Sequence, residues 1–201
     1  EIGRVQGDCL DGSTVEVLTK SGHFLGKGII NNKSKIRVRL FTRNRDESID
    51  LNFFINRFTQ AQELRRTLYD PKDSYRLVFA EADLVPGLVV DRFVNLEGEV
   101  FLSVQFLTLG VEQYKNEIIL ALETTEHPKA MYERSDVHVR RLEGLPEQKG
   151  WIGSSHNPII TIRENNIDLK VDLENGQKTG YFLDQKANRK LVGNLAKNKR
   201  V

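Results

Sequence analysis

The chain has 201 residues, of which 39% are hydrophobic and 29% charged, a balance typical of a globular protein with room for one large or two small domains. Its longest uncharged apolar stretch, residues 100–111, is shorter than the roughly 20 residues of a membrane-spanning helix, so we expect no membrane partner. A single cysteine, Cys9, excludes an internal disulfide and a cysteine-rich metal cluster, which predicts a cytoplasmic protein.

The formal net charge of +2 is distributed unevenly along the chain. Residues 1–48 contain nine Lys and Arg against six Asp and Glu, residues 49–150 contain twelve against seventeen, and residues 151–201 contain nine against five. Two basic ends around an acidic middle indicate separate modules, with a polyanion as the partner of one or both ends.

The first module, residues 1–48, is predicted to contain short strands at 15–18, 24–30 and 33–40. Basic and aliphatic residues alternate in the last of these. Because strand side chains point to opposite faces with period 2, Lys35, Arg37 and Arg39 should line one face and the aliphatic residues at 36, 38 and 40 the other. The pattern predicts a small β-barrel or sandwich with one basic strand.

A helix is expected from Asp50 to about Tyr69, where Asp70-Pro71 ends it, and residues 49–73 are interpreted as a connector. The central module, residues 74–158, has an α+β pattern. Its expected strands are 75–79, 88–93, 99–106 and 130–134, its expected helices are 111–122 and a short one ending at 142, and Ser135-Asp136 is a candidate cap for the latter.

The last part, residues 159–201, begins with an alternating pattern on both sides of Asn165-Asn166, which predicts a β-hairpin. A helix is expected after the segment 176–180, with Asp184 as its N-cap and apolar residues at 187, 191 and 195. The segment Gly176–Gly180 is not a P-loop, because Gln177 and Asp172 stand where that motif requires glycine.

The basic segment 33–45 carries six Lys and Arg and no acidic residue. A row of fixed cations can neutralise successive phosphates, so we interpret it as an RNA contact; a solvated edge strand is the alternative. The candidate RNA-binding residues are Lys33, Lys35, Arg37, Arg39 and Arg43.

Other chemistry-bearing residues form weaker patterns. Glu81, Asp83 and Asp91 offer carboxylates for acid–base work, although turn acids and surface charges are the favoured interpretation. The four histidines lack metal-ligand spacing, so no metal site is expected. Cys9 has no basic neighbour nearer in sequence than Arg4 and is interpreted as an unreactive thiol.

Three stretches resemble one known family, the RlmI-type large-subunit ribosomal RNA methyltransferases. They are residues 35–39 with the following helix, residues 76–93 (RLVFAEADLVPGLVVDRF) and residues 176–189 (GQKTGYFLDQKANR). The first is similar to the family's PUA domain and connector, the second to its central domain, and the third to the entry of its methyltransferase domain. Leu84 stands where the family usually has glycine, and Lys186 where it usually has arginine.

The resemblance implies an α+β architecture: a PUA-like β-barrel, a connector helix, a central α+β domain, and a hairpin and helix that open a Rossmann-like methyltransferase domain. It further implies S-adenosylmethionine as cofactor and 5-methylcytidine formation in 23S ribosomal RNA, in which a cysteine thiolate adds to C6 of cytosine. The family segment beside the cofactor pocket matches Lys178, Thr179, Phe182, Asp184, Gln185 and Arg189.

The family's cofactor loop and catalytic cysteine have no counterpart between Glu1 and Val201, and Cys9 matches neither. The expectation is therefore a fragment, clipped at the N-terminus, that binds RNA and has no catalytic residue of its own; a homodimer is a further possibility. A complete, non-enzymatic RNA-binding adaptor is the alternative function, and a protein-only scaffold is disfavoured by the charge distribution.

Overall fold

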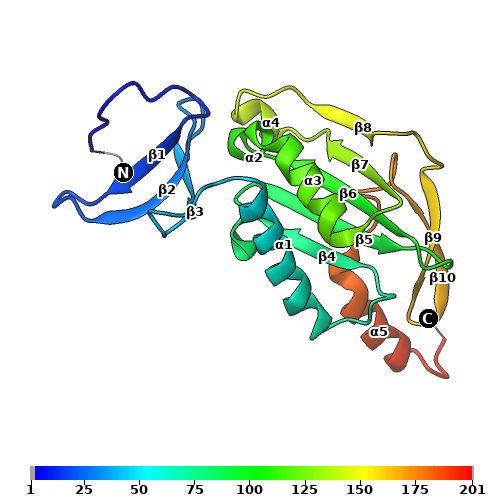
Figure 1. Cartoon of the computed structure of the whole chain (residues 1–201). Coiled ribbons are helices and arrows are strands. Elements are labelled where there is room, and N and C mark those ends of the chain that lie inside the picture. Colours follow the sequence, from blue (N-terminus) through cyan, green and yellow to red (C-terminus); the bar gives the residue numbers. More distant parts are fainter. Residues whose placement is uncertain (1–2, 201) are drawn as a thin grey trace.

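The computed structural model describes residues 3–200, and the expected outer boundaries at Glu1 and Val201 lie outside them. Its three sheets have the strand orders β1-β2-β3, β4-β5-β6-β7-β8 and β10-β9 (Figure 1). The strands are β1 Thr14–Leu18, β2 Phe24–Ile30, β3 Val38–Thr42, β4 Tyr75–Phe79, β5 Leu88–Val94, β6 Val100–Phe106, β7 Ala130–Ser135, β8 Gln148–Ile152, β9 Ile159–Glu164 and β10 Ile167–Asp172. The helices are α1 Leu51–Arg66, α2 Leu109–Gln113, α3 Lys115–Glu126, α4 Val139–Leu142 and α5 Lys186–Leu195, with short 3-10 turns η1 Ala80–Asp83 and η2 Leu183–Gln185. The predicted α+β class is confirmed.

The predicted basic strand is wrong in its extent. β3 begins at Val38, so Lys35 and Arg37 precede it and Arg39 alone of the three lies on a strand. Residues 31–37 form a loop instead, because Ile30 pairs with Val38 and the backbone N–H of Asn31 donates to the carbonyl of Arg37 at 2.8 Å. Ile36, expected on the aliphatic face of the strand, is 56% exposed in this loop, whereas Phe41 of β3 is buried in the core.

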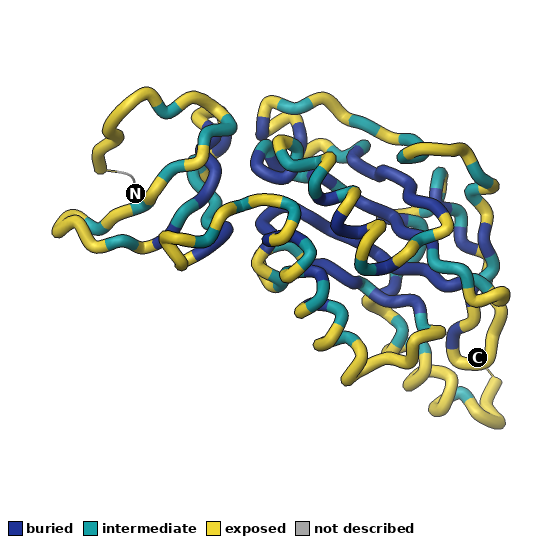
Figure 2. The backbone as a smooth tube through the Cα atoms, viewed as in Figure 1, coloured by how far each residue is buried: buried dark blue, intermediate teal, exposed yellow. Residues whose placement is uncertain are grey.

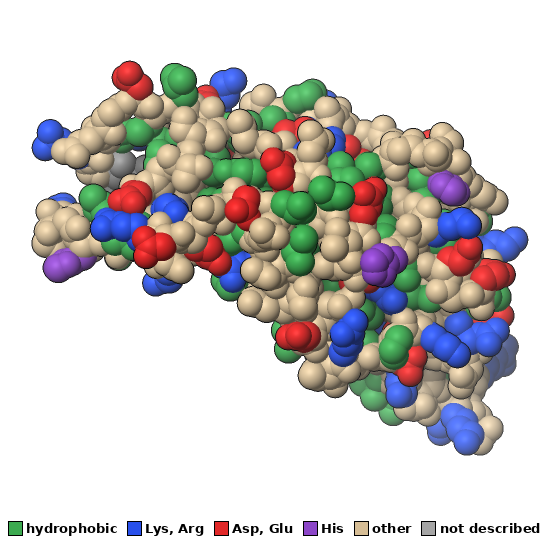
Figure 3. Space-filling model, viewed as in Figure 1, with side chains coloured by type: hydrophobic (Ala, Val, Ile, Leu, Met, Phe, Trp, Pro, Cys, Tyr) green, Lys and Arg blue, Asp and Glu red, His purple; other side chains and the backbone are tan. Residues whose placement is uncertain are grey.

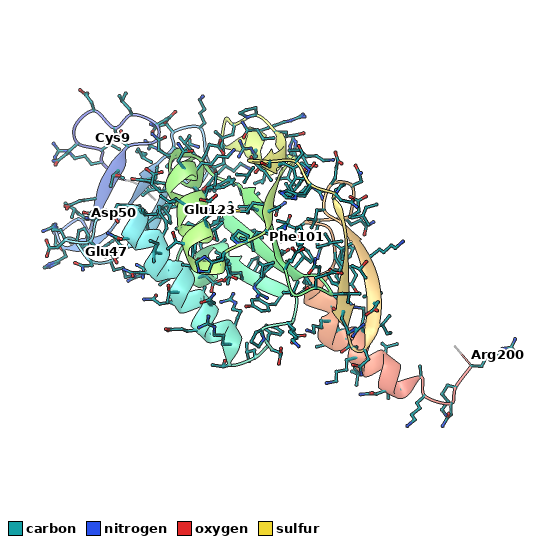
Figure 4. The ribbon with its side chains drawn as sticks, turned by 45° about the vertical axis from the view of Figure 1, so that its right-hand side comes forward. Cys9, Glu47, Asp50, Phe101, Glu123 and Arg200 are labelled. Carbon is teal, nitrogen blue, oxygen red and sulfur yellow. The ribbon has the colours of Figure 1, made fainter. Side chains whose placement is uncertain are left out.

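Helix α1 begins after Asp50, whose carboxylate accepts a hydrogen bond from the backbone N–H of Phe53 at 3.0 Å. This side-chain cap satisfies one of the free donors of the first turn. Phe53, Phe54 and Phe58 are buried, whereas Leu68, inside the expected helix range, lies beyond the end of α1 and is exposed. Figure 4 shows Glu47 and Asp50 between the N-terminal sheet and the start of this helix.

The five-stranded sheet has two buried faces. Helices α1 and α3 lie side by side over one face (Figure 1), and the core there runs from Ile29 and Phe41 of the N-terminal sheet to Val90 and Leu102. The β9–β10 hairpin packs on the other face against Phe93 of β5, Phe101 of β6 and Tyr132 of β7. Figure 2 shows the buried backbone concentrated in this sheet, with α5 and the N-terminal loop exposed.

Three features of the central module differ from expectation. The helix expected at 111–122 is two helices, α2 and α3, which meet at Tyr114 in a non-helical conformation (φ −103°, ψ 23°). Ser135 does not cap a helix: it ends β7, and its hydroxyl accepts from the backbone N–H of Phe106 at 3.0 Å. β8 was not anticipated, because its sequence lacks an alternating apolar pattern.

The predicted hairpin is confirmed, and both turn residues, Asn165 and Asn166, have positive φ (51° and 64°) as a two-residue turn requires. Asp184 is not the N-cap of α5; it lies one residue before the capping Gln185, and its carboxylate binds Lys178. Leu84 has φ 60°, the left-handed region that favours glycine, which gives a physical reason for glycine at this turn in the family that the sequence resembles. Among residues 3–200, no helix has the length and apolarity to cross a membrane.

Candidate functional site

The predicted RNA-binding residues differ in whether they already bind other side chains of the protein. Lys33, Lys35 and Arg43 are exposed, and none forms an ion pair with another described residue. Arg37 donates from Nη2 to the side-chain oxygen of Asn32 at 2.5 Å. These four cations therefore remain open to a polyanion. Figure 3 shows Lys and Arg interspersed with Asp and Glu over the N-terminal module on the face in view.

Arg39 is bound to two carboxylates. Its Nη1 lies 3.0 Å from Oε1 of Glu81, and its Nη2 lies 3.5 Å from Oε1 of Glu143. The Arg39 side chain is 21% exposed and that of Glu143 is 5% exposed. Arg39 thus joins β3 to the central module, and its charge is already compensated.

Glu143, at the end of α4, binds the loop 31–37, which is called the basic loop because it carries Lys33, Lys35 and Arg37. Its carboxylate accepts from Nδ2 of Asn31 at 3.0 Å and from the hydroxyl of Ser34 at 2.5 Å, and both of these side chains belong to buried residues. The backbone N–H of Leu109 also donates to it at 3.4 Å. One buried carboxylate therefore fixes the loop that carries Lys33 and Lys35.

The second candidate region is the loop 176–180, which packs against the five-stranded sheet. Thr179 is fully buried, and its hydroxyl donates to Asp91 of β5. Asp91 also accepts from Nε and Nη2 of Arg76 at 2.8 and 2.9 Å. Arg134 of β7 donates from Nη1 to the carbonyl of Gly176 at 3.0 Å. The loop is therefore attached to the sheet near both of its ends.

Four of the six predicted cofactor residues lie together beyond this anchor. Nζ of Lys178 lies 3.1 Å from Oδ1 of Asp184 and 4.4 Å from the ring centroid of Phe182, and Gln185 donates to Asp184 at 3.2 Å. The hydrogen bond from Lys178 lowers the pKa of the Asp184 carboxyl below its usual value. Lys178, Asp184 and Gln185 are exposed and Phe182 is partly buried, so the four form an accessible polar patch with one aromatic ring.

Arg189, the sixth, lies elsewhere. Its guanidinium donates to both oxygens of Glu164 at 2.6 and 2.9 Å and stacks 4.4 Å from the ring centroid of Tyr181. Both it and Tyr181 line a groove of about 1030 Å³ between the hairpin turn and α5. Lys186, which stands where the family that the sequence resembles usually has arginine, lies 2.7 Å from Oδ1 of Asp73. Because this contact needs only a positive charge, lysine can make it as well as arginine. The cofactor assignment of all six residues stays a prediction.

The three central carboxylates each bind a different arginine. Glu81 binds Arg39, Asp83 binds Arg65 and Asp91 binds Arg76. Asp83 and Asp91 are buried at the side chain, so the sequence-based interpretation as surface or turn acids is incomplete. Nothing in the local sequence marks Arg134 or Glu143, because the groups that they bind are distant in the chain.

Neither a thiol nor a metal cluster completes a catalytic arrangement in the part of the chain that the structure describes. Cys9 contacts the carbonyl of Gln6 at 3.6 Å, and Figure 4 places it in the N-terminal loop, at the opposite end of the molecule from Arg200. Residues 3–200 contain no group of three or more His, Cys, Asp or Glu side chains suited to a metal ion.

Comparison with known proteins gives one match to a domain family and a set of similar curated proteins. Residues 1–43 match the model of a PUA-like domain. The chain is 42% identical over 204 residues to ribosomal RNA large subunit methyltransferase I of Aeromonas hydrophila and 38% identical over 203 residues to that of Erwinia tasmaniensis, with all of this chain and 50% of each relative aligned. The resemblance to the RlmI-type methyltransferases is confirmed. The chain spans about half the length of these curated relatives.

Solved structures show the same fold. A protein of Streptococcus mutans, assigned as a SAM-dependent methyltransferase, superposes with a TM-score of 0.73 at 24% identity, covering 94% of this chain and 47% of its own. SMU.776, an assigned methyltransferase solved in complex with SAH, superposes with a TM-score of 0.72 at 23% identity, covering 90% of this chain and 44% of its own.

Proposed function

We propose that this chain is the RNA-binding portion of a methyltransferase that uses S-adenosylmethionine to form 5-methylcytidine in 23S ribosomal RNA, and that its residues 178–189 lie beside the cofactor pocket. The observation that carries the proposal is the alignment of the entire chain, at 42% identity, with a ribosomal RNA large subunit methyltransferase. The PUA-like match at residues 1–43 supports the RNA part, because it covers the loop with the open cations.

The patch around Lys178 has the donor set that S-adenosylmethionine requires. Lys178 can pair with the carboxylate of the cofactor, Asp184 can accept from its ammonium or ribose hydroxyls, and Phe182 offers a ring for its adenine or sulfonium group. Bound there, the cofactor supplies the methyl group. Lys178 and Asp184 are exposed and pair with each other, so both charges are accessible to the cofactor.

Residues 1–201 are proposed to bind RNA without transferring a methyl group. Methylation at C5 of cytosine needs a thiolate that adds to C6, and the only cysteine of the chain is Cys9. Cys9 belongs to the N-terminal loop, whereas the candidate cofactor patch lies in the segment 178–185. The catalytic thiol is therefore assigned to residues outside this sequence.

A methyl-transfer assay tests the proposal. The protein expressed from its complete reading frame is incubated with labelled S-adenosylmethionine and 23S ribosomal RNA from a strain that lacks the gene, and nucleosides are analysed by mass spectrometry. We expect label in 5-methylcytidine. Label in another nucleoside would overturn the cytosine assignment, and RNA binding without any transfer would favour a non-enzymatic adaptor.

Charge reversal of the basic loop should weaken RNA binding. For the double variant Lys33→Glu and Lys35→Glu we expect about a tenfold lower affinity for a 23S ribosomal RNA fragment at low salt, and a salt dependence reduced by about one counterion for each lost phosphate contact. The measurement is a fluorescence titration at several salt concentrations.

Lys170→Glu is the matched control, because Lys170 is exposed on β10, outside the PUA-like module. It should leave the affinity within twofold of wild type. Because the control changes the net charge by half as much as the double variant, a control that lost about half as much on a logarithmic scale would show that net charge, rather than the basic loop, governs binding.

A further inference from the structure

We propose that Asp91 and Arg76 are positioning residues that act through Thr179. They set the shape of the loop 176–180, called here the candidate cofactor loop. This inference deepens the proposed function and rests on it, since it concerns how the same loop is prepared to bind S-adenosylmethionine. It also gives a role to Asp91, which belongs neither to the candidate RNA-binding residues nor to the polar patch around Lys178.

The first observation is where Asp91 lies. It is fully buried in the middle of β5, directly opposite Arg76 of β4 in the antiparallel register. A buried carboxylate is costly unless it is paired and hydrogen-bonded. Arg76 supplies two hydrogen bonds, at 2.8 and 2.9 Å, and with them a compensating charge. One acceptor position remains on Oδ2, and the Thr179 hydroxyl occupies it.

The second observation is the conformation of the loop. Lys178, next to Thr179, has φ 56°, a left-handed conformation that is strained for a residue other than glycine. Such a conformation persists only where the surroundings hold it. With the side chain of Thr179 directed into the sheet, the adjacent Lys178 is directed outward to Asp184 and Phe182. The buried hydrogen bond therefore determines where the Lys178 ammonium lies.

The third observation is that the sheet attaches the loop at a second point. Arg134 of β7 donates from Nη1 to the carbonyls of Leu173 and Gly176, both at 3.0 Å. Gly176 itself leaves no room for a side chain, because a Cβ there would lie 2.3 Å from the carbonyl oxygen of Asp172. Held at both ends, the loop presents Lys178 to the polar patch without having to become ordered when the cofactor binds, which preserves affinity.

The same contact between Asp91 and Thr179 would be present if it only stabilised the fold. The test must therefore separate the conformation of the loop 176–180 from the stability of the whole protein. Thr179→Val removes the hydroxyl and keeps the size of the side chain, whereas Thr179→Ser keeps the hydroxyl. Asp91→Asn removes the charge that Arg76 compensates. Asp168→Asn is the matched control, because Asp168 also accepts two hydrogen bonds from one arginine, Arg163, at 2.6 and 2.9 Å, but on the exposed hairpin.

The experiment uses the protein expressed from its complete reading frame. Affinity for S-adenosylmethionine is measured by calorimetry, and amide hydrogen exchange of residues 176–180 is measured without cofactor. We expect Thr179→Val and Asp91→Asn to bind the cofactor at least tenfold more weakly and to exchange faster in this loop, with Tm changed by only a few degrees. Thr179→Ser and Asp168→Asn should stay within twofold of wild type.

The outcomes distinguish the two proposals. Wild-type protein that shows no affinity for S-adenosylmethionine overturns the proposed function and the positioning role with it. Wild-type protein that binds, with Thr179→Val binding equally well and exchanging at the same rate, overturns the positioning role alone. If Asp91→Asn does not fold, the comparison of Thr179→Val with Thr179→Ser decides, because rescue by serine requires the hydroxyl.

Discussion

Replacing Glu143 with alanine is expected to lower the free energy of unfolding by about 3 kcal/mol and to release the basic loop from α4. The substitution removes the acceptor of Asn31 and Ser34, two buried side chains, and leaves Arg39 paired only with the exposed Glu81. Urea denaturation measures the stability, and faster amide exchange in residues 31–37 reports the release of the loop.

Glu147→Ala is the control for this variant. Glu147 binds Arg141 at 2.8 Å, but the arginine side chain is 65% exposed, and ion pairs in water contribute little. We expect a change within about 0.5 kcal/mol. A similarly small effect for Glu143→Ala would show that the N-terminal sheet is held to the central module without this carboxylate.

Strands with a local signal could be predicted from the sequence. β2 and β4 have the predicted bounds, because each is a run of apolar or alternating residues between turn residues, and the hairpin follows from Asn165-Asn166. The PUA-like match includes residues 33–43 of the basic segment, and the RNA contact that the charge distribution predicts stays a prediction. Apolar runs, alternation and turn residues are properties of neighbouring residues, and they need no knowledge of the rest of the chain.

The basic segment shows where such reasoning fails. Residues 33–40 alternate as a strand does, yet residues 31–37 form a loop. Asn31 and Ser34 bind Glu143, which follows them by 112 and 109 positions, and this tertiary contact overrides the local periodicity. Arg39 was likewise grouped with the free cations, because its partners Glu81 and Glu143 are distant in sequence.

The same limit applies to the candidate cofactor loop. Its candidate residues were chosen by resemblance to the family. The sequence did not predict that Lys178 and Asp184 would be exposed while Thr179 would be buried against the sheet. Thr179 and Asp91 are 88 positions apart, and only the fold shows that one binds the other. The two faces of the five-stranded sheet therefore have different partners. One face packs against α1 and α3, and the other packs against the β9–β10 hairpin and binds the loop 176–180.

The core beneath α1 predicts that the N-terminal sheet and the five-stranded sheet unfold together. Phe54 is fully buried, and its ring lies 5.3 Å from that of Phe53 and 5.6 Å from that of Tyr114, measured between centroids. Both of these rings also contact Phe41 of β3. Phe54→Ala should therefore lower the free energy of unfolding by about 4 kcal/mol through lost burial and the cavity left behind.

Urea denaturation followed separately by far-UV circular dichroism and by the fluorescence of Trp151, which lies on β8, tests this expectation. The two signals should shift together to lower urea with an unchanged slope, because the cluster connects the sheets in one core. Leu64→Ala on the same helix is the control, since Leu64 is 55% exposed and its loss should cost less than about 1 kcal/mol. Separate transitions for the two signals would mean that the N-terminal sheet folds independently of the central module, so that Glu143 and the aromatic cluster join two units that are each stable alone.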